Sequence, residues 1–73
     1  MTIIEINKGI FLNVENVFKF ELLKTEDEKY YFRFHSEADL IADSMIFNTQ
    51  DLAREWISMR VIRAAGADEI LGL

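Results

Sequence analysis

Cysteine and proline are absent from the chain, and glycine occurs only three times, as Gly9, Gly66 and Gly72. Without cysteine, neither a disulfide nor a thiolate metal site can stabilise the fold, which fits a reducing compartment. With no proline and so little glycine, most turns must be built from other polar residues.

Long hydrophobic segments are absent as well. No apolar run approaches the roughly 18 residues that a membrane-spanning helix requires. Residues 1–8 have no basic start and carry Glu5 within their apolar stretch, so they do not have the pattern of a signal peptide. We therefore expect a cytoplasmic protein without a membrane segment.

The chain is short but rich in apolar side chains. Residues 1–73 are expected to form a single domain with a small core, because a chain of about 60 residues buries only about 60% of its unfolded surface. Hydrophobic residues make up 51% of the sequence, including six Phe, two Tyr and one Trp, which argues against a disordered chain. The formal net charge of −5 favours solubility and disfavours contact with a phosphate backbone.

Alternation of apolar and polar residues predicts short antiparallel strands over most of the chain. Residues 1–16 are expected to form an N-terminal strand extension with two short β segments. Gly9 supplies the turn between these segments, because glycine accepts a positive φ without strain. Residues 17–47 are expected to form a β-meander.

Two segments of this meander alternate most clearly, residues 17–23 and residues 30–35. The polar run 24–29 between them predicts a hairpin loop, so the two segments should pair. A turn at residues 36–39 then leads to a further β segment over residues 40–47, whose alternation is imperfect.

From Asn48 the apolar period changes to that of a helix, which we expect over residues 48–65. Asn48 is the expected N-cap, and Phe47 is expected to pack on Leu52 as a hydrophobic staple. Gly66 supplies a stop signal, and residues 66–73 are expected to form a short tail.

Strands that precede a single helix are typical of an α+β fold. We predict a small antiparallel β-sheet of four to five short strands with one C-terminal helix packed across one face, because this arrangement buries the apolar faces of both. The side chains expected in the core are Phe18, Phe20, Phe32, Phe34, Trp56 and Ile57.

Three pieces of the chain between residues 18 and 62 have the order and spacing of a known pattern. They are the strand Phe18-Lys19-Phe20-Glu21-Leu22-Leu23-Lys24, the loop and aromatic strand Asp27-Glu28-Lys29-Tyr30-Tyr31-Phe32-Arg33-Phe34, and the residues Leu40-Ile41-Ala42-Asp43-Ser44, Phe47-Asn48-Thr49, Ala53 and Ile57. In these pieces the chain resembles the YegP-like family of small uncharacterised domains. The resemblance implies a three-stranded antiparallel unit with a helix, seen in tandem or as a symmetric dimer. For a single unit it implies a homodimer, and it implies no activity.

Two features of the chain depart from that family. The turn before the third strand, which is Asn-Gly in the family, is here His35-Ser36-Glu37-Ala38-Asp39, without glycine. Residues 1–16 have no counterpart in the family pattern, so the resemblance implies nothing about this extension.

No residue pattern indicates catalysis or a bound cofactor. His35 is the only histidine, and beside Ser36 and Glu37 at a strand end we interpret it as a solvated turn residue, since a catalytic or metal-binding histidine needs partners held in geometry. The acidic loop Glu26-Asp27-Glu28 lacks the alternating ligands and the glycine turn of a calcium loop. With no phosphate loop or nucleophile motif, we predict that the protein is not an enzyme and has no catalytic residue, metal site or cofactor.

Lys19, Tyr31 and Arg33 should share the outward face of the two clearest strands and form a candidate interaction surface. Tyr and Arg are enriched at protein interfaces, and aromatic groups beside basic ones can also stack single-stranded bases. The leading hypothesis is a non-catalytic interaction module that forms a homodimer through its sheet face or a free strand edge. The alternatives are an acidic inhibitor or regulator that binds a basic site on another protein, and a single-stranded nucleic-acid binder, which the negative charge disfavours.

Overall fold

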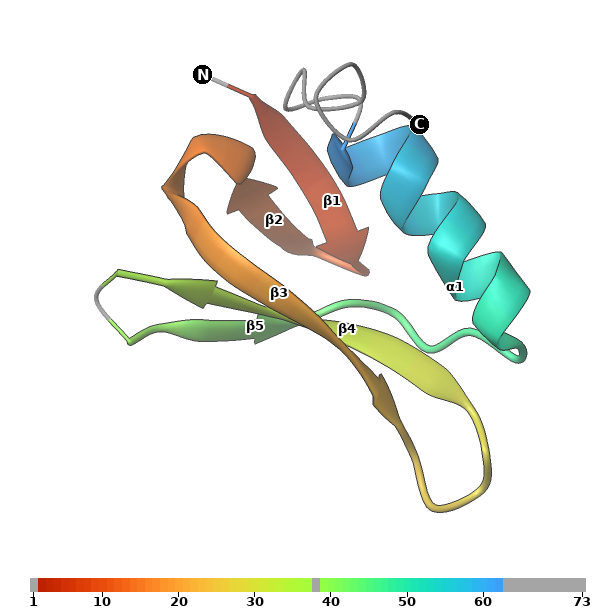
Figure 1. Ribbon diagram of the computed structural model, residues 1–73. Coiled ribbons are helices and arrows are strands. Elements are labelled where there is room, and N and C mark those ends of the chain that lie inside the picture. The colour runs from red at the N-terminus through yellow and green to blue at the C-terminus, as the bar shows by residue number, and fades with distance from the viewer. Residues whose placement is uncertain (1, 38, 63–73) are drawn as a thin grey trace.

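The computed structural model describes residues 2–37 and 39–62, and it has the predicted α+β fold (Figure 1). The elements are β1 (Ile3–Asn7), β2 (Ile10–Asn13), β3 (Val17–Lys24), β4 (Tyr30–Ser36), β5 (Ile41–Asp43) and α1 (Gln50–Trp56). A 3₁₀ turn over Val14–Asn16 joins β2 to β3, and a π-helical segment over Ile57–Ile62 continues α1. The fold class is confirmed, with the strands divided between two antiparallel sheets. None of the described helices is long and apolar enough to cross a membrane.

The first sheet is the hairpin of β1 and β2. Gly9 makes its turn with a φ of +76°, a backbone conformation that favours glycine. Two backbone hydrogen bonds tie the hairpin to its surroundings: Val14 N–H donates to the Thr2 carbonyl at 2.9 Å, and Met45 N–H donates to the Ile6 carbonyl at 2.7 Å. The hairpin is therefore fixed at its open end and to the segment that follows β5.

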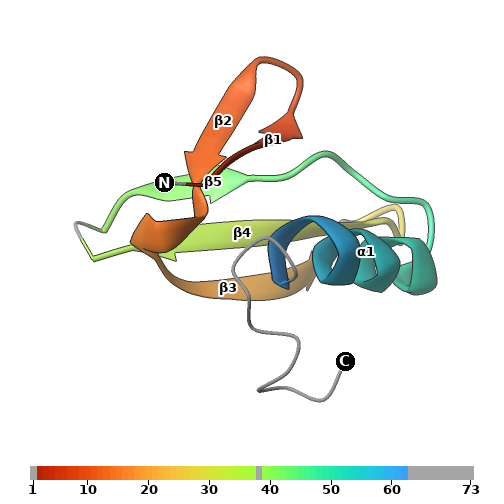
Figure 2. The ribbon, with the colours of Figure 1, turned by 90° about the horizontal axis from the view of Figure 1, so that it is seen from above.

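The second sheet has the strand order β3–β4–β5, with β3 at one border (Figure 2). The β3–β4 connection is the predicted polar loop. In it the Thr25 hydroxyl accepts a hydrogen bond from Lys29 N–H at 3.0 Å and donates one to Asp27 Oδ1 at 2.6 Å. The loop carboxylate of Asp27 is thus held by its own chain, and this contact lowers the pKa of Asp27.

The core lies on one face of this second sheet. Phe32 and Phe34 of β4 are almost completely buried there, and Trp56 of α1 packs over both, with ring centroids 6.0 and 6.4 Å away. The hairpin and the helix cover this face together, because their apolar side chains join the same cluster. The buried members of the cluster are Ile6, Val14, Phe32, Phe34, Ala53, Ile57 and Val61.

The predicted core is confirmed at Phe32, Phe34 and Ile57, but it is wrong at Phe18, whose side chain is 68% exposed. The pairing of β3 with β4 shifts register between Val17 and Lys19. Phe18 is the extra residue of this β-bulge, so it leaves the alternation that would have turned it inward. Phe20 does contact the core rings, yet it remains 38% exposed because β3 is an edge strand.

The start of the helix also differs from the prediction. The N-cap is Thr49, not Asn48, and the Thr49 hydroxyl accepts a hydrogen bond from Leu52 N–H at 3.1 Å. Leu52, expected on the buried side, is 50% exposed, and the ring of Phe47 instead lies 5.4 Å from that of Trp56. Residues 63–65 of the predicted helix and the predicted tail 66–73 lie outside the described residues.

The last predicted strand, residues 40–47, is interrupted. Regular pairing with β4 covers only β5, and it resumes at a single bridge between Tyr30 and Phe47. Between the pairs Arg33–Asp43 and Tyr30–Phe47, β4 advances by three residues and the segment after β5 by four. That segment therefore has one extra residue, and regular pairing cannot continue through it. Within this irregular stretch the buried Ser44 hydroxyl accepts a hydrogen bond from Phe32 N–H at 2.9 Å.

Candidate functional site

The face of the second sheet that points away from the core carries a group of charged side chains, which we call the outer face. Alternation within each strand brings them to this side, and strand pairing sets their order. Lys19 lies opposite His35, Glu21 opposite Arg33, and Arg33 opposite Asp43. The outer face comprises Lys19 and Glu21 of β3, Tyr31, Arg33 and His35 of β4, and Asp43 of β5.

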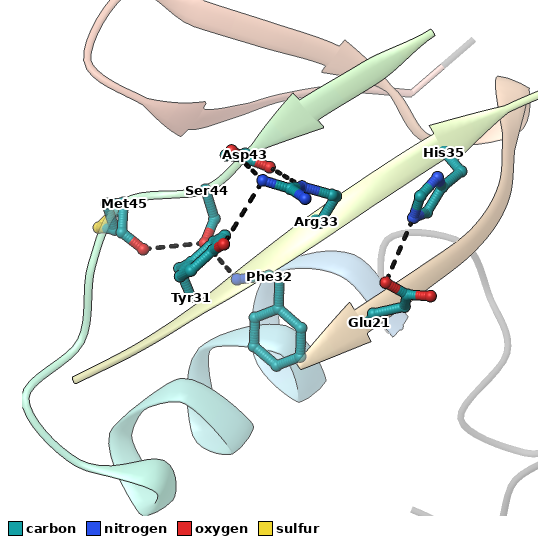
Figure 3. Close-up of polar contacts among 8 residues, drawn as sticks. All are labelled: Glu21, Tyr31, Phe32, Arg33, His35, Asp43, Ser44 and Met45. Atoms are coloured by element: carbon teal, nitrogen blue, oxygen red, sulfur yellow. Dashed lines mark hydrogen bonds and ion pairs between the residues drawn. The ribbon is translucent and has the colours of Figure 1, made fainter. Parts of the chain in front are cut away.

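Arg33 is the centre of the outer face (Figure 3). Its guanidinium makes two hydrogen bonds to the Asp43 carboxylate, Nε to Oδ1 at 2.9 Å and Nη2 to Oδ2 at 3.2 Å. The same Nη2 lies 3.4 Å from the Tyr31 hydroxyl, and the guanidinium carbon lies 5.7 Å from the centre of the Tyr31 ring. The hydrogen bonds to the Asp43 carboxylate raise the pKa of Arg33, so the guanidinium is charged at every ordinary pH.

Glu21 forms a second centre beside the sheet border. Its carboxylate lies 3.5 Å from the Lys19 ammonium and 3.5 Å from His35 Nε2. Desolvation acts to raise the pKa of Glu21, but the contacts with His35 and Lys19 outweigh it and lower that pKa. Glu21 is therefore held in its charged form at neutral pH.

His35 is not the solvated turn residue that its sequence context suggests. It lies within β4, and its side chain is only 20% exposed. Its Nε2 atom is buried without a hydrogen bond in the described structure, although Glu21 is within ion-pair distance. The reason is that β4 extends to Ser36, so His35 is a strand residue facing Lys19.

Among the described residues, no three His, Cys, Asp or Glu side chains gather as a metal ion would require. The arrangement instead offers matched charges in sequence across the strands: Asp43, Arg33 and Glu21 alternate in sign from β5 to β3. Within the sheet, each charge in this row faces a charge of opposite sign on the next strand. The row ends on the border strand β3 with the Glu21 carboxylate.

The direction of the backbone groups on β3 follows from the hydrogen bonds of its neighbours. Tyr30 exchanges hydrogen bonds with Phe47 at 2.9 and 2.7 Å, and Phe32 bonds to Ser44, so both residues direct their backbone groups toward the β5 side. Backbone groups alternate along an antiparallel strand, so Tyr31 and Arg33 point toward β3. Their partners Leu23 and Glu21 point back toward β4.

The intervening residues of β3 consequently direct their N–H and C=O groups away from the sheet. These residues are Phe20, Leu22 and Lys24, and no strand among the described residues pairs with this edge. Phe18 and Phe20 are both residues of β3, and their side chains are 68% and 38% exposed. We call this the β3 edge.

A shallow hollow of about 240 Å³ lies elsewhere, between β2 and the β4–β5 end of the sheet. Apolar side chains dominate its walls, among them Phe11, Leu40 and Ile41. Of the outer-face residues only His35 lines it, so it offers no convergent set of charged groups and indicates no particular ligand.

The predicted site residues Lys19, Tyr31 and Arg33 do lie together on the outer face. The prediction missed Glu21, His35 and Asp43, which complete it. The alternation of β3 places Glu21 beside Lys19, so that residue could have been included. Asp43 could not have been included, because its place beside Arg33 depends on the register of β5. The imperfect alternation of residues 40–47 does not fix that register.

The chain was compared with protein-family models, curated proteins and solved structures, and none of them matches it. The resemblance to the YegP-like family therefore stays a prediction.

Proposed function

We propose that the chain is a non-catalytic interaction module that forms a homodimer, and that the β3 edge is its contact surface. The observation that carries this proposal is the eight-residue β3 at the border of its sheet, with unpaired backbone groups and two exposed Phe side chains. A long edge strand with apolar side chains is a template for pairing with another strand. Proteins that do not use such an edge cover it, shorten it or break it with proline.

The two alternatives gain less support from the site. Single-stranded nucleic-acid binding needs a free cation and an open aromatic face, yet the Arg33 guanidinium is bound to Asp43 and lies over Tyr31. An acidic inhibitor needs a surface of one sign, yet positive and negative side chains alternate on the outer face.

Sedimentation equilibrium at micromolar concentration tests the proposal. We expect a mass twice the 8.5 kDa of one chain. Phe18→Lys places a charge beside the β3 edge at a position that is 68% exposed, so it should weaken the dimer without unfolding the chain. Phe11→Lys is the matched control, because Phe11 is 66% exposed and lies on the other sheet. A wild-type chain that is strictly monomeric at this concentration contradicts the proposal.

A further inference from the structure

The charges of β3 define how two copies of this edge would fit together. Resting on the homodimer proposed above, we infer that β3 pairs antiparallel with β3 of a second copy around Phe20, so that two three-stranded sheets become one of six strands. In this register, Lys19 of each copy lies directly opposite Glu21 of the other.

Symmetry limits the choice of registers. A two-fold axis perpendicular to the sheet makes the two β3 strands antiparallel and keeps both cores on one side of the combined sheet. Residues directly opposite each other then point to the same face. The axis must therefore pass through a residue position. The four central positions of β3, which keep most of the strand paired, are Lys19, Phe20, Glu21 and Leu22.

Hydrogen bonding is satisfied with the axis at Phe20. Phe20 and Leu22 direct their backbone groups out of the sheet, as their neighbours' bonds require. Phe20 of one copy can then exchange both backbone hydrogen bonds with Phe20 of the other. On the core side, Phe20 of one copy meets Phe20 of the other, so apolar side chains meet at the axis.

The charges select this register. With the axis at Phe20, Lys19 of the second copy follows Glu21 in the row of alternating charges Asp43, Arg33 and Glu21. By symmetry, Lys19 of the first copy lies opposite Glu21 of the second in the same way. An axis at Lys19 would oppose two ammonium groups, and an axis at Glu21 would oppose two carboxylates. An axis at Leu22 would place Glu21 opposite Leu23 and Phe20 opposite Lys24. On both faces of the sheet, a charged side chain would then lie opposite an apolar one.

Disulfide trapping tests the register, since the chain has no cysteine of its own. We mix Lys19→Cys and Glu21→Cys protein under mild oxidation. Lys19 and Glu21 of different copies form a non-hydrogen-bonded pair with Cα atoms about 4.5 Å apart, within the range that a disulfide spans. Each mixed dimer keeps its second Lys19–Glu21 pair intact, so the variants do not remove the attraction that they test.

Each competing register has its own control. Lys19→Cys alone traps an axis at Lys19, and Glu21→Cys alone traps an axis at Glu21; in the inferred dimer these like positions are diagonal neighbours about 7–8 Å apart. A mixture of Glu21→Cys with Leu23→Cys traps an axis at Leu22. We expect the Lys19/Glu21 mixture to cross-link severalfold faster than all three controls.

The outcomes separate the register from the homodimer. If the wild-type chain sediments as a dimer but a control cross-links as fast as the Lys19/Glu21 mixture, the register is wrong and the homodimer stands. If the wild-type chain is a monomer, the proposed function fails and the inferred register fails with it.

Charge reversal gives a second measurement that needs no cysteine. Lys19→Glu opposes two carboxylates twice per dimer and should raise the dissociation constant by on the order of tenfold. The double variant Lys19→Glu with Glu21→Lys restores opposite charges and should recover most of that loss. Equal dissociation constants for the single and the double variant would overturn the inferred register.

Discussion

Removal of the Ser44 hydroxyl is a sharp test of how the sheet is completed beyond β5. Ser44 is the only buried polar residue among those described, with 2% exposure. Its hydroxyl accepts a hydrogen bond from Phe32 N–H at 2.9 Å and donates one to the Met45 carbonyl at 2.8 Å (Figure 3). It thereby takes the place of a strand carbonyl where regular pairing stops.

Ser44→Ala leaves the buried Phe32 N–H without an acceptor, because a methyl group cannot accept a hydrogen bond and the site is closed to water. An unsatisfied buried donor costs about 1–3 kcal/mol, and in a domain of 60–100 residues each 1 kcal/mol lowers Tm by about 4–8 °C. The second bond, to the Met45 carbonyl, is only partly buried, so its loss should add less than the loss of the first. We therefore expect a loss of about 1–3 kcal/mol in the free energy of unfolding.

Urea unfolding followed by fluorescence of Trp56 measures this loss, because the Trp56 ring packs on Phe32 and Phe47 in the core. Ser58→Ala is the matched control: it removes the same atom from the helical segment and should change stability by less than about 0.5 kcal/mol. Both variants are compared at one protein concentration, since dimerisation would add to stability. A Ser44→Ala variant as stable as Ser58→Ala would refute the reasoning.

Three further predictions concern other parts of the fold. Ile6→Ala should lower the free energy of unfolding by about 2–5 kcal/mol, because Ile6 is fully buried in the shared core. The control Phe11→Ala, on the same hairpin but exposed, should change it by no more than about 0.5 kcal/mol. Equal effects in thermal or urea unfolding would contradict a hairpin docked through Ile6. Gly9→Ala should cost about 1 kcal/mol through backbone strain alone, since its φ is +76° and no atom lies within 4 Å of an added Cβ; an unchanged urea midpoint would disprove that turn. The lowered pKa of Glu21 means that its contribution is present above its ordinary pKa of 4.5 and is lost as the pH falls through the lower folded value. The stability difference between wild type and Glu21→Gln should accordingly shrink as the pH falls below about 4.5, and a difference that grows in acid would show the opposite sign.

Sequence alternation predicted the fold where side chains follow the strand period without interruption. The β3–β4 hairpin was recovered because its two segments alternate on both sides of a polar loop, and Phe32 and Phe34 were assigned correctly to the core. The failure at Phe18 has a local cause: a bulge adds one residue to β3, and a period of two carries no information about such an insertion.

The remaining errors arise from side chains that replace backbone partners. Ser44 accepts the bond of Phe32 N–H, so the last predicted strand stops early although its sequence stays β-rich. Thr49 caps the helix one residue after Asn48, although Asn is the stronger N-cap of the two residue types. For the site, Lys19, Tyr31 and Arg33 could be predicted from alternation, whereas Asp43 required the register of β5.

Amide hydrogen exchange at β3 tests the central claim most directly. In an isolated chain, the N–H groups of Phe20 and Leu22 point out of the sheet, whereas those of Glu21 and Leu23 are bonded to β4. A dimer through the β3 edge predicts that Phe20 and Leu22 become protected as protein concentration rises, while Glu21 and Leu23 are protected at every concentration. Fast exchange at Phe20 and Leu22 throughout a dilution series up to high micromolar concentration would contradict it.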